Sequence, residues 1–104
     1  MASTAEIFDG IKGRFNAGAA AGLDVVFQFN IDDSDQYHLI VKDEACDLVA
    51  GEHGDPSVTL IMDGQTLAEI AEGETNGMQA FMAGKLRTEG DMMLATKLSD
   101  LFSI

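Results

Sequence analysis

The sequence is poor in cysteine, proline and basic residues, and it contains no tryptophan. Its one cysteine, Cys46, cannot form a disulfide within the chain, so the fold does not require an oxidising compartment. The chain has one proline, Pro56, and disordered linkers usually contain more prolines than this. Six basic residues stand against 18 acidic ones, and the net charge of −12 disfavours binding to nucleic acid and to anionic lipid headgroups.

Long apolar runs are absent as well. No stretch approaches the roughly 18 consecutive apolar residues that a membrane-spanning helix needs. Residues 1–6 lack the basic start and apolar core of a signal peptide, and residues 101–104 are not a peroxisomal signal. We therefore expect a cytoplasmic protein, with residues 1–104 forming a single globular domain.

The first half of the chain changes from a helical to an extended period. A capping box at residues 3–6 begins an amphipathic helix that should end near the glycine-alanine segment 18–22. From Leu23 apolar residues recur at every second position, as in a β-strand, and clusters of turn residues follow. Four strands are predicted, over residues 23–31, 37–41, 46–50 and 57–62, the first three as an antiparallel meander.

Helices dominate the second half. Asp63, then Thr75 or Asn76, and finally Asp91 are suited to begin three helices, and a short strand over residues 85–89 separates the last two. The sequence thus predicts an α+β fold, in which a five-stranded, largely antiparallel sheet carries its helices on one face.

Motifs for catalysis and for metal binding are missing. His38 and His53 are not spaced as zinc or iron ligands, and an apparent calcium loop has Asp35 where glycine is required. Leu86 follows Gly84-Lys85 where a phosphate-binding loop has Ser or Thr. Cys46 is interpreted as a small buried hydrophobe. We predict that the chain is not an enzyme and binds no metal or other cofactor.

Methionine is concentrated in the second half of the chain. The five that follow the initiator all lie beyond residue 60, namely Met62, Met78, Met82, Met92 and Met93. Methionine is flexible and polarizable, so it can line a cavity that adapts to different ligands, although it can equally fill a core. Met92 and Met93 lie at the margin of the apolar face of the last helix, where a pocket rim is more plausible than a core centre.

Residues 79–98 resemble the sterol carrier protein type 2 family. The family pattern there is close to A-F-x-x-G-K-L-K-x-x-G-[DN]-M-x-x-A-x-K-L, and the matching residues are Ala80, Phe81, Gly84, Lys85, Leu86, Gly90, Asp91, Met92, Ala95, Lys97 and Leu98. A weaker likeness extends over nearly the whole chain. The resemblance implies a five-stranded sheet covered by helices that enclose a hydrophobic tunnel for fatty acids, acyl-CoA esters, sterols or similar lipids, which are bound and transferred without being converted.

The same resemblance implies a set of lipid-binding residues. These are Phe27, Met62, Leu67, Ile70, Met78, Phe81, Met82, Leu86, Met93, Leu94, Leu98, Leu101 and Phe102. Gly84 and Gly90 are interpreted as residues that serve the backbone conformation and do not contact the ligand. Lys85 and Lys97 are interpreted as solvated side chains.

The expected partners are an apolar, lipid-like ligand, a lipid-metabolising enzyme and, transiently, a membrane. Because no extended tail carries a peroxisomal signal, we expect a free-standing, bacterial-type member, and this departure weakens the expectation that a sterol is its natural ligand. Two alternatives to a carrier remain at this point: an accessory module that presents a lipid or quinone intermediate to an enzyme, and an ester or thioester hydrolase.

Overall fold

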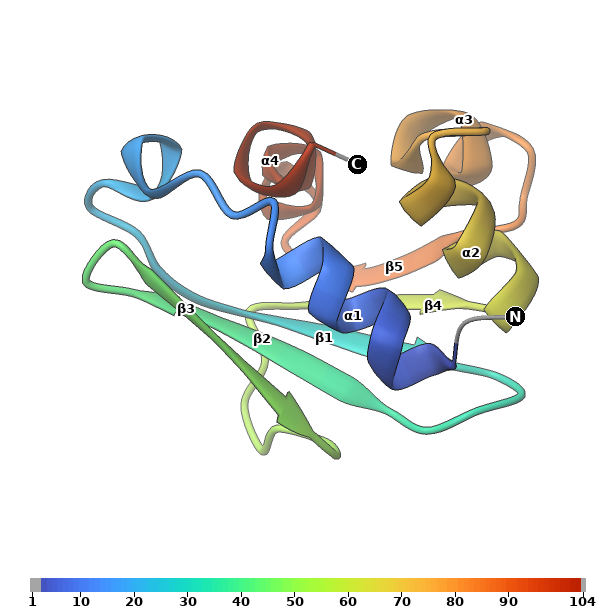
Figure 1. The fold of residues 1–104 in the computed structure, drawn as a ribbon, viewed down its shortest axis with the longest axis horizontal. Coiled ribbons are helices and arrows are strands. Elements are labelled where there is room, and N and C mark those ends of the chain that lie inside the picture. Colours follow the sequence, from blue (N-terminus) through green and yellow to red (C-terminus); the bar gives the residue numbers. More distant parts are fainter. Residues whose placement is uncertain (1–2, 104) are drawn as a thin grey trace.

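The computed structural model describes residues 3–103 and arranges them as one mixed sheet with helices on one of its faces (Figure 1). The helices are α1 (Thr4–Lys12), the short 3₁₀ helix η1 (Ala17–Ala20), α2 (Gly64–Glu72), α3 (Gly77–Met82) and α4 (Met92–Phe102). The strands are β1 (Asp24–Ile31), β2 (Tyr37–Lys42), β3 (Ala45–Ala50), β4 (Val58–Met62) and β5 (Arg87–Gly90). No helix within this described part is long and apolar enough to cross a membrane.

The strand order is β3-β2-β1-β4-β5. β1 pairs with β2, β2 with β3 and β4 with β5 in antiparallel fashion, while β1 and β4 run parallel. A parallel pair requires a connection that returns the chain to the starting end of the sheet. The β2–β3 hairpin and the loop over residues 51–57, which crosses the face opposite the helices, provide it (Figure 1). The predicted α+β fold, with its five-stranded and largely antiparallel sheet, is confirmed.

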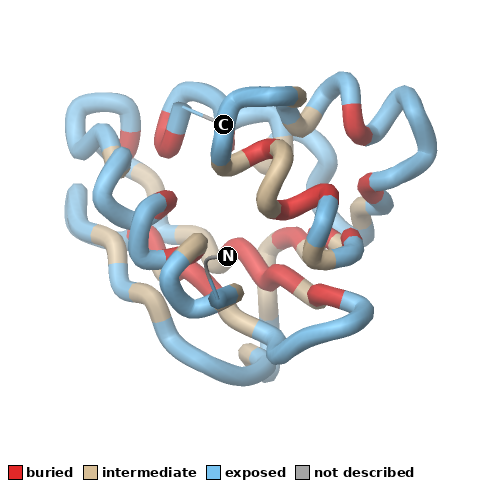
Figure 2. Tube along the Cα trace, turned by 45° about the vertical axis from the view of Figure 1, so that its right-hand side comes forward, coloured by how far each residue is buried: buried red, intermediate tan, exposed pale blue. Residues whose placement is uncertain are grey.

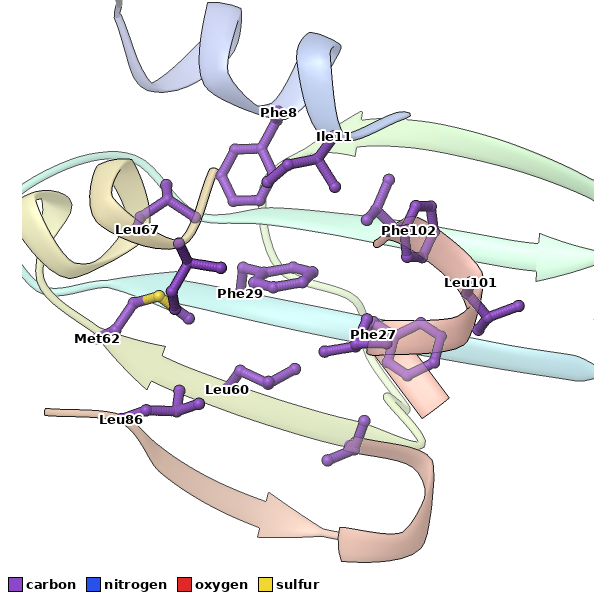
Figure 3. Packing of buried hydrophobic residues seen from close by; sticks show 14 of the residues in the cluster. Phe8, Ile11, Phe27, Phe29, Leu60, Met62, Leu67, Leu86, Leu101 and Phe102 are labelled. Atoms are coloured by element: carbon purple, nitrogen blue, oxygen red, sulfur yellow. The ribbon is translucent and has the colours of Figure 1, made fainter. Parts of the chain in front are cut away.

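The core lies between the sheet and the helices. The buried strand residues on this side alternate along each strand: Phe27, Phe29 and Ile31 on β1, Leu39 and Val41 on β2, and Val58, Leu60 and Met62 on β4. Figure 2 shows the buried positions gathered along these strands and on the helical turns that cover them. The Phe8 ring of α1 lies 5.1 Å from the Phe29 ring, and the Phe102 ring of α4 lies 6.4 Å from the Phe27 ring, centroid to centroid (Figure 3).

The opposite face of the sheet is partly covered by the loop over residues 51–57. Gln28 is fully buried there, and its Oε1 accepts a hydrogen bond from the His53 N–H at 2.8 Å. His38 is also buried, and its Nδ1 lies 3.0 Å from the Gly51 carbonyl oxygen. These polar groups anchor the crossing loop, because each of them would be costly to bury without a partner.

The first helix is shorter than the sequence pattern predicts. α1 ends at Lys12, where the Gly13 N–H bonds to the Asp9 carbonyl, so Phe15 lies beyond the helix. Glycines at positions 10 and 13 lower the helical propensity of this turn. Asn16 then caps η1 through a hydrogen bond from the Gly18 N–H, a short 3₁₀ turn that the period of apolar residues could not reveal.

Gly90 is the last residue of β5, which spans Arg87–Gly90 and not the predicted residues 85–89. Its φ of +95° lies in the region that glycine adopts freely. A Cβ at this position would lie 2.9 Å from the Ser57 carbonyl oxygen and 3.3 Å from the Val58 Cα. The close pairing of β5 with β4 therefore requires glycine here, and this pairing brings β5 alongside the candidate site.

Candidate functional site

One pocket opens between the helix-covered face of the sheet and helices α2, α3 and α4. Its cavity volume is about 330 Å³, near the lower end of the range of about 300–1,000 Å³ that is usual for small-molecule sites. Its wall is formed by Phe29, Leu60, Met62, Leu67, Ile70, Asn76, Gly77, Met78, Phe81, Leu86, Thr88, Met92, Ala95, Thr96, Leu98 and Ser99. We refer to this site as the pocket.

The floor of the pocket comes from the central strands. Phe29 of β1, with Leu60 and Met62 of β4, points toward the helices from neighbouring positions on parallel strands (Figure 3). Leu86 extends the floor beside Leu60, just before β5 begins. Because side chains alternate across a sheet, the period that buries the core also supplies this apolar surface.

Helix caps fix where the helices of the pocket wall begin and so orient their side chains. The Asp63 carboxylate accepts a hydrogen bond from the Thr66 N–H at 2.8 Å and so begins α2, which turns Leu67 and Ile70 inward one helical turn apart. Hydrogen bonds from the side chain and the backbone of Thr66 hold the pKa of Asp63 below its ordinary value. Asn76 begins α3 in the same manner, through the Gln79 N–H.

Small residues on α4 leave the space open. Ala95 and Ser99 lie one helical turn apart and contribute to the pocket wall, whereas Leu101 and Phe102, in the last turn of the helix, are buried in the core. Gly77 on α3 contributes no side chain at all. Larger side chains at these places would close the gap between α3 and α4, so the pocket exists because this part of the interface is built from small groups.

The mouth of the pocket is apolar and exposed. Met78 is 58% exposed and Met92 is 52% exposed, and both form part of the wall, together with Phe81 at the surface. Met82 and Met93 are 80% and 76% exposed and lie outside the wall. Exposed apolar side chains of this size gathered at an opening are unusual for a monomer surface and indicate an interaction site.

The structure divides the thirteen residues expected to bind lipid into three groups. Seven lie in the pocket wall: Met62, Leu67, Ile70, Met78, Phe81, Leu86 and Leu98. Four pack in or against the core and are absent from the wall: Phe27, Leu94, Leu101 and Phe102. The remaining two, Met82 and Met93, point outward. The spacing of apolar residues on a short helix does not fix which side of the helix faces the sheet.

Nine residues of the wall are not among the thirteen expected to bind lipid, although Met92 was expected at a pocket rim. These are Phe29, Leu60, Asn76, Gly77, Thr88, Met92, Ala95, Thr96 and Ser99. The family resemblance pointed to Phe27 and Met62, and period-two alternation puts Phe29 and Leu60 on the same faces of their strands, so it could have added them. Small and polar residues such as Ala95 carry no signal of their own, because they are common on any helix surface.

No charged side chain contributes to the wall of the pocket. Two basic residues near the start of β5 pair with carboxylates: Lys85 Nζ lies 3.9 Å from a Glu69 oxygen, and Arg87 Nη2 lies 3.9 Å from an Asp32 oxygen. The lining is therefore apolar with a few neutral amide and hydroxyl groups, which is the usual chemistry of a site for an apolar ligand.

Groups suited to catalysis are not assembled around the pocket. Among residues 3–103, no group of three or more His, Cys, Asp or Glu side chains is placed to hold a metal ion. Cys46 lies on β3, is half-buried against the core and takes no part in the wall. Burial raises the pKa of its thiol to about 11, so the reactive thiolate is scarce at neutral pH.

Residues 8–103 match the model of the SCP-2 sterol transfer family. The chain belongs to this family. Among curated proteins, this SCP-2 domain is 29% identical over 106 residues to the peroxisomal multifunctional enzyme A of Dictyostelium discoideum, and 28% identical over 105 residues to the hydroxysteroid dehydrogenase-like protein 2 of Danio rerio. Each match covers 95% of this chain but only 24% and 25% of those relatives, respectively.

Solved structures share the fold of this SCP-2 domain. The palmitated SCP2L2 of Aedes aegypti is 28% identical with a TM-score of 0.76, over 95% of this chain and 93% of its own. The sec-alkylsulfatase Pisa1 of Pseudomonas sp. gives a TM-score of 0.85 at 19% identity, over 97% of this chain and 16% of its own. A ubiquinone synthesis protein, UbiJ-SCP2, gives a TM-score of 0.63 at 18% identity, over 91% of this chain and 87% of its own. With the family assignment, the pocket makes this chain a lipid-binding domain.

Proposed function

We propose that this SCP-2 domain is a non-catalytic carrier that holds one lipid in the pocket and transfers it between partners. The observation that supports the proposal best is an open, uncharged and largely apolar cavity between the sheet and α2, α3 and α4. An alkyl chain bound there would lie against Leu60, Met62 and Phe81 and would be removed from water, which is the main source of affinity for such a ligand.

The methionines at the mouth suit a ligand longer than the cavity accommodates. Met78 and Met92 border the opening, and their unbranched thioether side chains can repack as a chain enters. The relative from Aedes aegypti was determined in palmitated form, which makes a long alkyl chain a reasonable ligand class for this domain as well. A hydrophobic tunnel, as implied by the family resemblance, would then form on binding.

Transient membrane contact is part of this proposal. The pocket mouth on α3 and α4 carries the exposed methionines, and a carrier must collect its lipid from a membrane or a protein. The acidic residues are mostly elsewhere: residues 1–75 carry 15 acidic and 3 basic residues, whereas residues 76–104 carry 3 of each. The end of the chain that forms the mouth can therefore approach an uncharged bilayer without strong repulsion.

Native mass spectrometry of the purified protein tests the carrier function. We expect a bound species of lipid mass that disappears on delipidation and returns, with a stoichiometry of one, when a long-chain lipid is added back. A cytoplasmic carrier should also release that lipid unchanged. If no lipid copurifies and none binds after delipidation, the proposal is wrong; conversion of the lipid would show that the domain is an enzyme.

A second candidate is an accessory module that presents a lipid intermediate to a lipid-metabolising enzyme. It is favoured by the relatives whose names denote enzymes and of which this chain spans about a quarter, since there an SCP-2 domain is part of a longer protein. Lipid exchange with vesicles distinguishes the two functions. A carrier exchanges lipid with vesicles by itself, whereas a presenting module releases its lipid only when the partner enzyme is added.

A further inference from the structure

We propose that Met78 and Met92, the two methionines at the mouth of the pocket, are sites of reversible oxidation by hydrogen peroxide, and that their sulfoxides hinder lipid from entering. This regulation rests on the proposed function and acts at the same site. Three features of the molecule support it: the exposure of these two side chains, their place in the pocket wall, and the poor reactivity of the other candidate for oxidation, Cys46.

The sulfur atoms of both side chains are open to a dissolved oxidant. Met78, in the first turn of α3, and Met92, at the start of α4, are each more than half exposed. Met62, on the floor of the pocket, is 3% exposed. Because α3 and α4 contact each other, the two exposed thioethers border the same opening. We expect peroxide to oxidise both of them and to spare Met62.

The oxidation transfers two electrons from sulfur to the peroxide. A lone pair on the methionine sulfur attacks one peroxide oxygen, the O–O bond breaks, an S–O bond forms, and after proton transfer the second oxygen leaves as water. Methionine sulfoxide reductases reverse the step with two thiols, which become a disulfide while the sulfoxide oxygen leaves as water. The domain itself supplies only the sulfur atoms.

Cys46 does not compete for the oxidant at neutral pH. Peroxide reacts with the thiolate form of cysteine. Burial raises the pKa of the Cys46 thiol to about 11, and the side chain lies half-buried on β3, outside the pocket wall. Because the sequence contains no second cysteine, the exposed methionines are the principal targets of a mild oxidant.

A sulfoxide in the wall opposes lipid binding. An alkyl chain that enters the pocket packs against Met78 and Met92 and removes them from water, which suits a thioether. A sulfoxide oxygen is a hydrogen-bond acceptor and is costly to bury without a donor. The Thr96 hydroxyl, one helical turn after Met92, already donates to the Met93 carbonyl at 2.7 Å. The oxidised mouth should therefore bind an alkyl chain more weakly than the reduced mouth does.

Calorimetric titration with dodecanoate before and after peroxide treatment tests the proposal. We expect oxidation of Met78 and Met92, located by mass spectrometry of peptides, to lower the affinity by at least about tenfold. Reductases for both sulfoxide epimers should restore it. Unaltered affinity in the oxidised protein overturns the proposal but leaves the carrier function intact. If the untreated protein binds neither dodecanoate nor 1-dodecanol, the proposed function itself fails.

Two double variants test whether the wall methionines cause the loss. Met82 and Met93 are more exposed than Met78 and Met92 but lie outside the wall. In Met82→Leu/Met93→Leu, peroxide should still lower the affinity by about tenfold, whereas Met78→Leu/Met92→Leu should lose less than about twofold, each relative to its own untreated sample, because leucine has a similar volume and cannot be oxidised. The reverse pattern, or equal losses in both variants, overturns the assignment.

Bound ligand should protect the wall methionines from peroxide. At saturating dodecanoate we expect oxidation of Met78 and Met92 to slow, while oxidation of Met82 and Met93 keeps its rate in the free protein. Equal rates at Met78 and Met92 with and without ligand contradict the proposal. Thermal unfolding of the oxidised protein is the control for the fold: if its cooperative transition is lost together with the affinity, oxidation acts on the fold and the proposal is wrong.

Discussion

Single small side chains decide whether this domain has a cavity at all. Ala95 lies in the pocket wall, whereas Leu101 and Phe102, in the last turn of α4, are buried and hold the helix to the core. The same helix therefore packs tightly in its last turn and leaves space beside the turns before it. In a protein interior, side chains normally fill such space. In this domain we assign the space to the ligand.

Ala95→Leu should separate ligand binding from stability. The added side chain enters the pocket, so we expect the affinity for a C12 lipid to fall by about tenfold or more. The free energy of unfolding should stay the same or rise by about 0.5–2 kcal/mol, as cavity-filling substitutions usually do. Ala19→Leu, at an exposed position of η1, is the control and should alter neither quantity. A large loss of stability in Ala95→Leu, or unaltered affinity, would show that the cavity is not the binding site.

The sequence could predict the apolar residues of the pocket only in part. The family resemblance pointed to Met62 and Leu98, and both lie in the wall. It also pointed to Phe27 and Phe102, which pack in the core, because a core and a pocket are lined by the same residue types. The difference arises from the small side chains across the interface, at Ala95 and Ser99, which no local pattern distinguishes from surface residues.

At the scale of elements, helix caps position the pocket walls. Asp63 begins α2 and so orients Leu67 and Ile70, and the hydrogen bonds from Thr66 that fix the cap also lower the pKa of the Asp63 carboxyl. A lowered pKa in the folded state means that this group stabilises the fold above its unfolded-state pKa of about 4, and that the contribution is lost as the pH falls through the folded-state pKa.

Asp63→Asn should remove this pH dependence while it retains the cap. Asparagine caps a helix nearly as well, so we expect a small loss of stability at pH 7, against about 1 kcal/mol for Asp63→Ala. Urea unfolding of the wild type and of Asp63→Asn at several pH values should show the difference between them shrinking below about pH 4. A difference that stays constant as the pH falls would mean that the carboxylate does not contribute through its charge.

The elements themselves were largely predictable, with errors where the chain departs from a regular period. Caps at Ser3, Asp63 and Asp91 were identified from residue type and begin helices as expected. The end of α1 was placed too late, since Gly13 ends it before the apolar period at Phe15 is complete. Gly90 belongs to β5 because of its close approach to Ser57, a contact between distant residues that no local pattern contains.

Charge and apolar exposure are separated along the chain. The excess of acidic residues lies in residues 1–75, while the exposed methionines of the pocket mouth lie on α3 and α4, in the part of the chain without net charge. The distribution favours contact between the mouth and an uncharged surface and disfavours contact between the rest of the molecule and an anionic one.

Vesicle flotation should reveal this preference. We expect binding to phosphatidylcholine vesicles that does not increase, or that falls, when phosphatidylserine is added. Met82→Asp, at an exposed position outside the pocket, should weaken vesicle binding by about tenfold and leave lipid affinity in solution unchanged. Stronger binding to vesicles that contain phosphatidylserine would contradict the proposed mode of contact.

The methionines provide the most direct test of the central claim, which is that a lipid occupies the pocket. Their ¹³C-labelled methyl groups can be followed by NMR while dodecanoate or 1-dodecanol is added to saturation. We expect the methyls of Met62, Met78 and Met92, which belong to the wall, to shift, and those of Met82 and Met93, which lie outside it, to remain in place. Shifts confined to Met82 and Met93, or none at saturating lipid, would contradict the account.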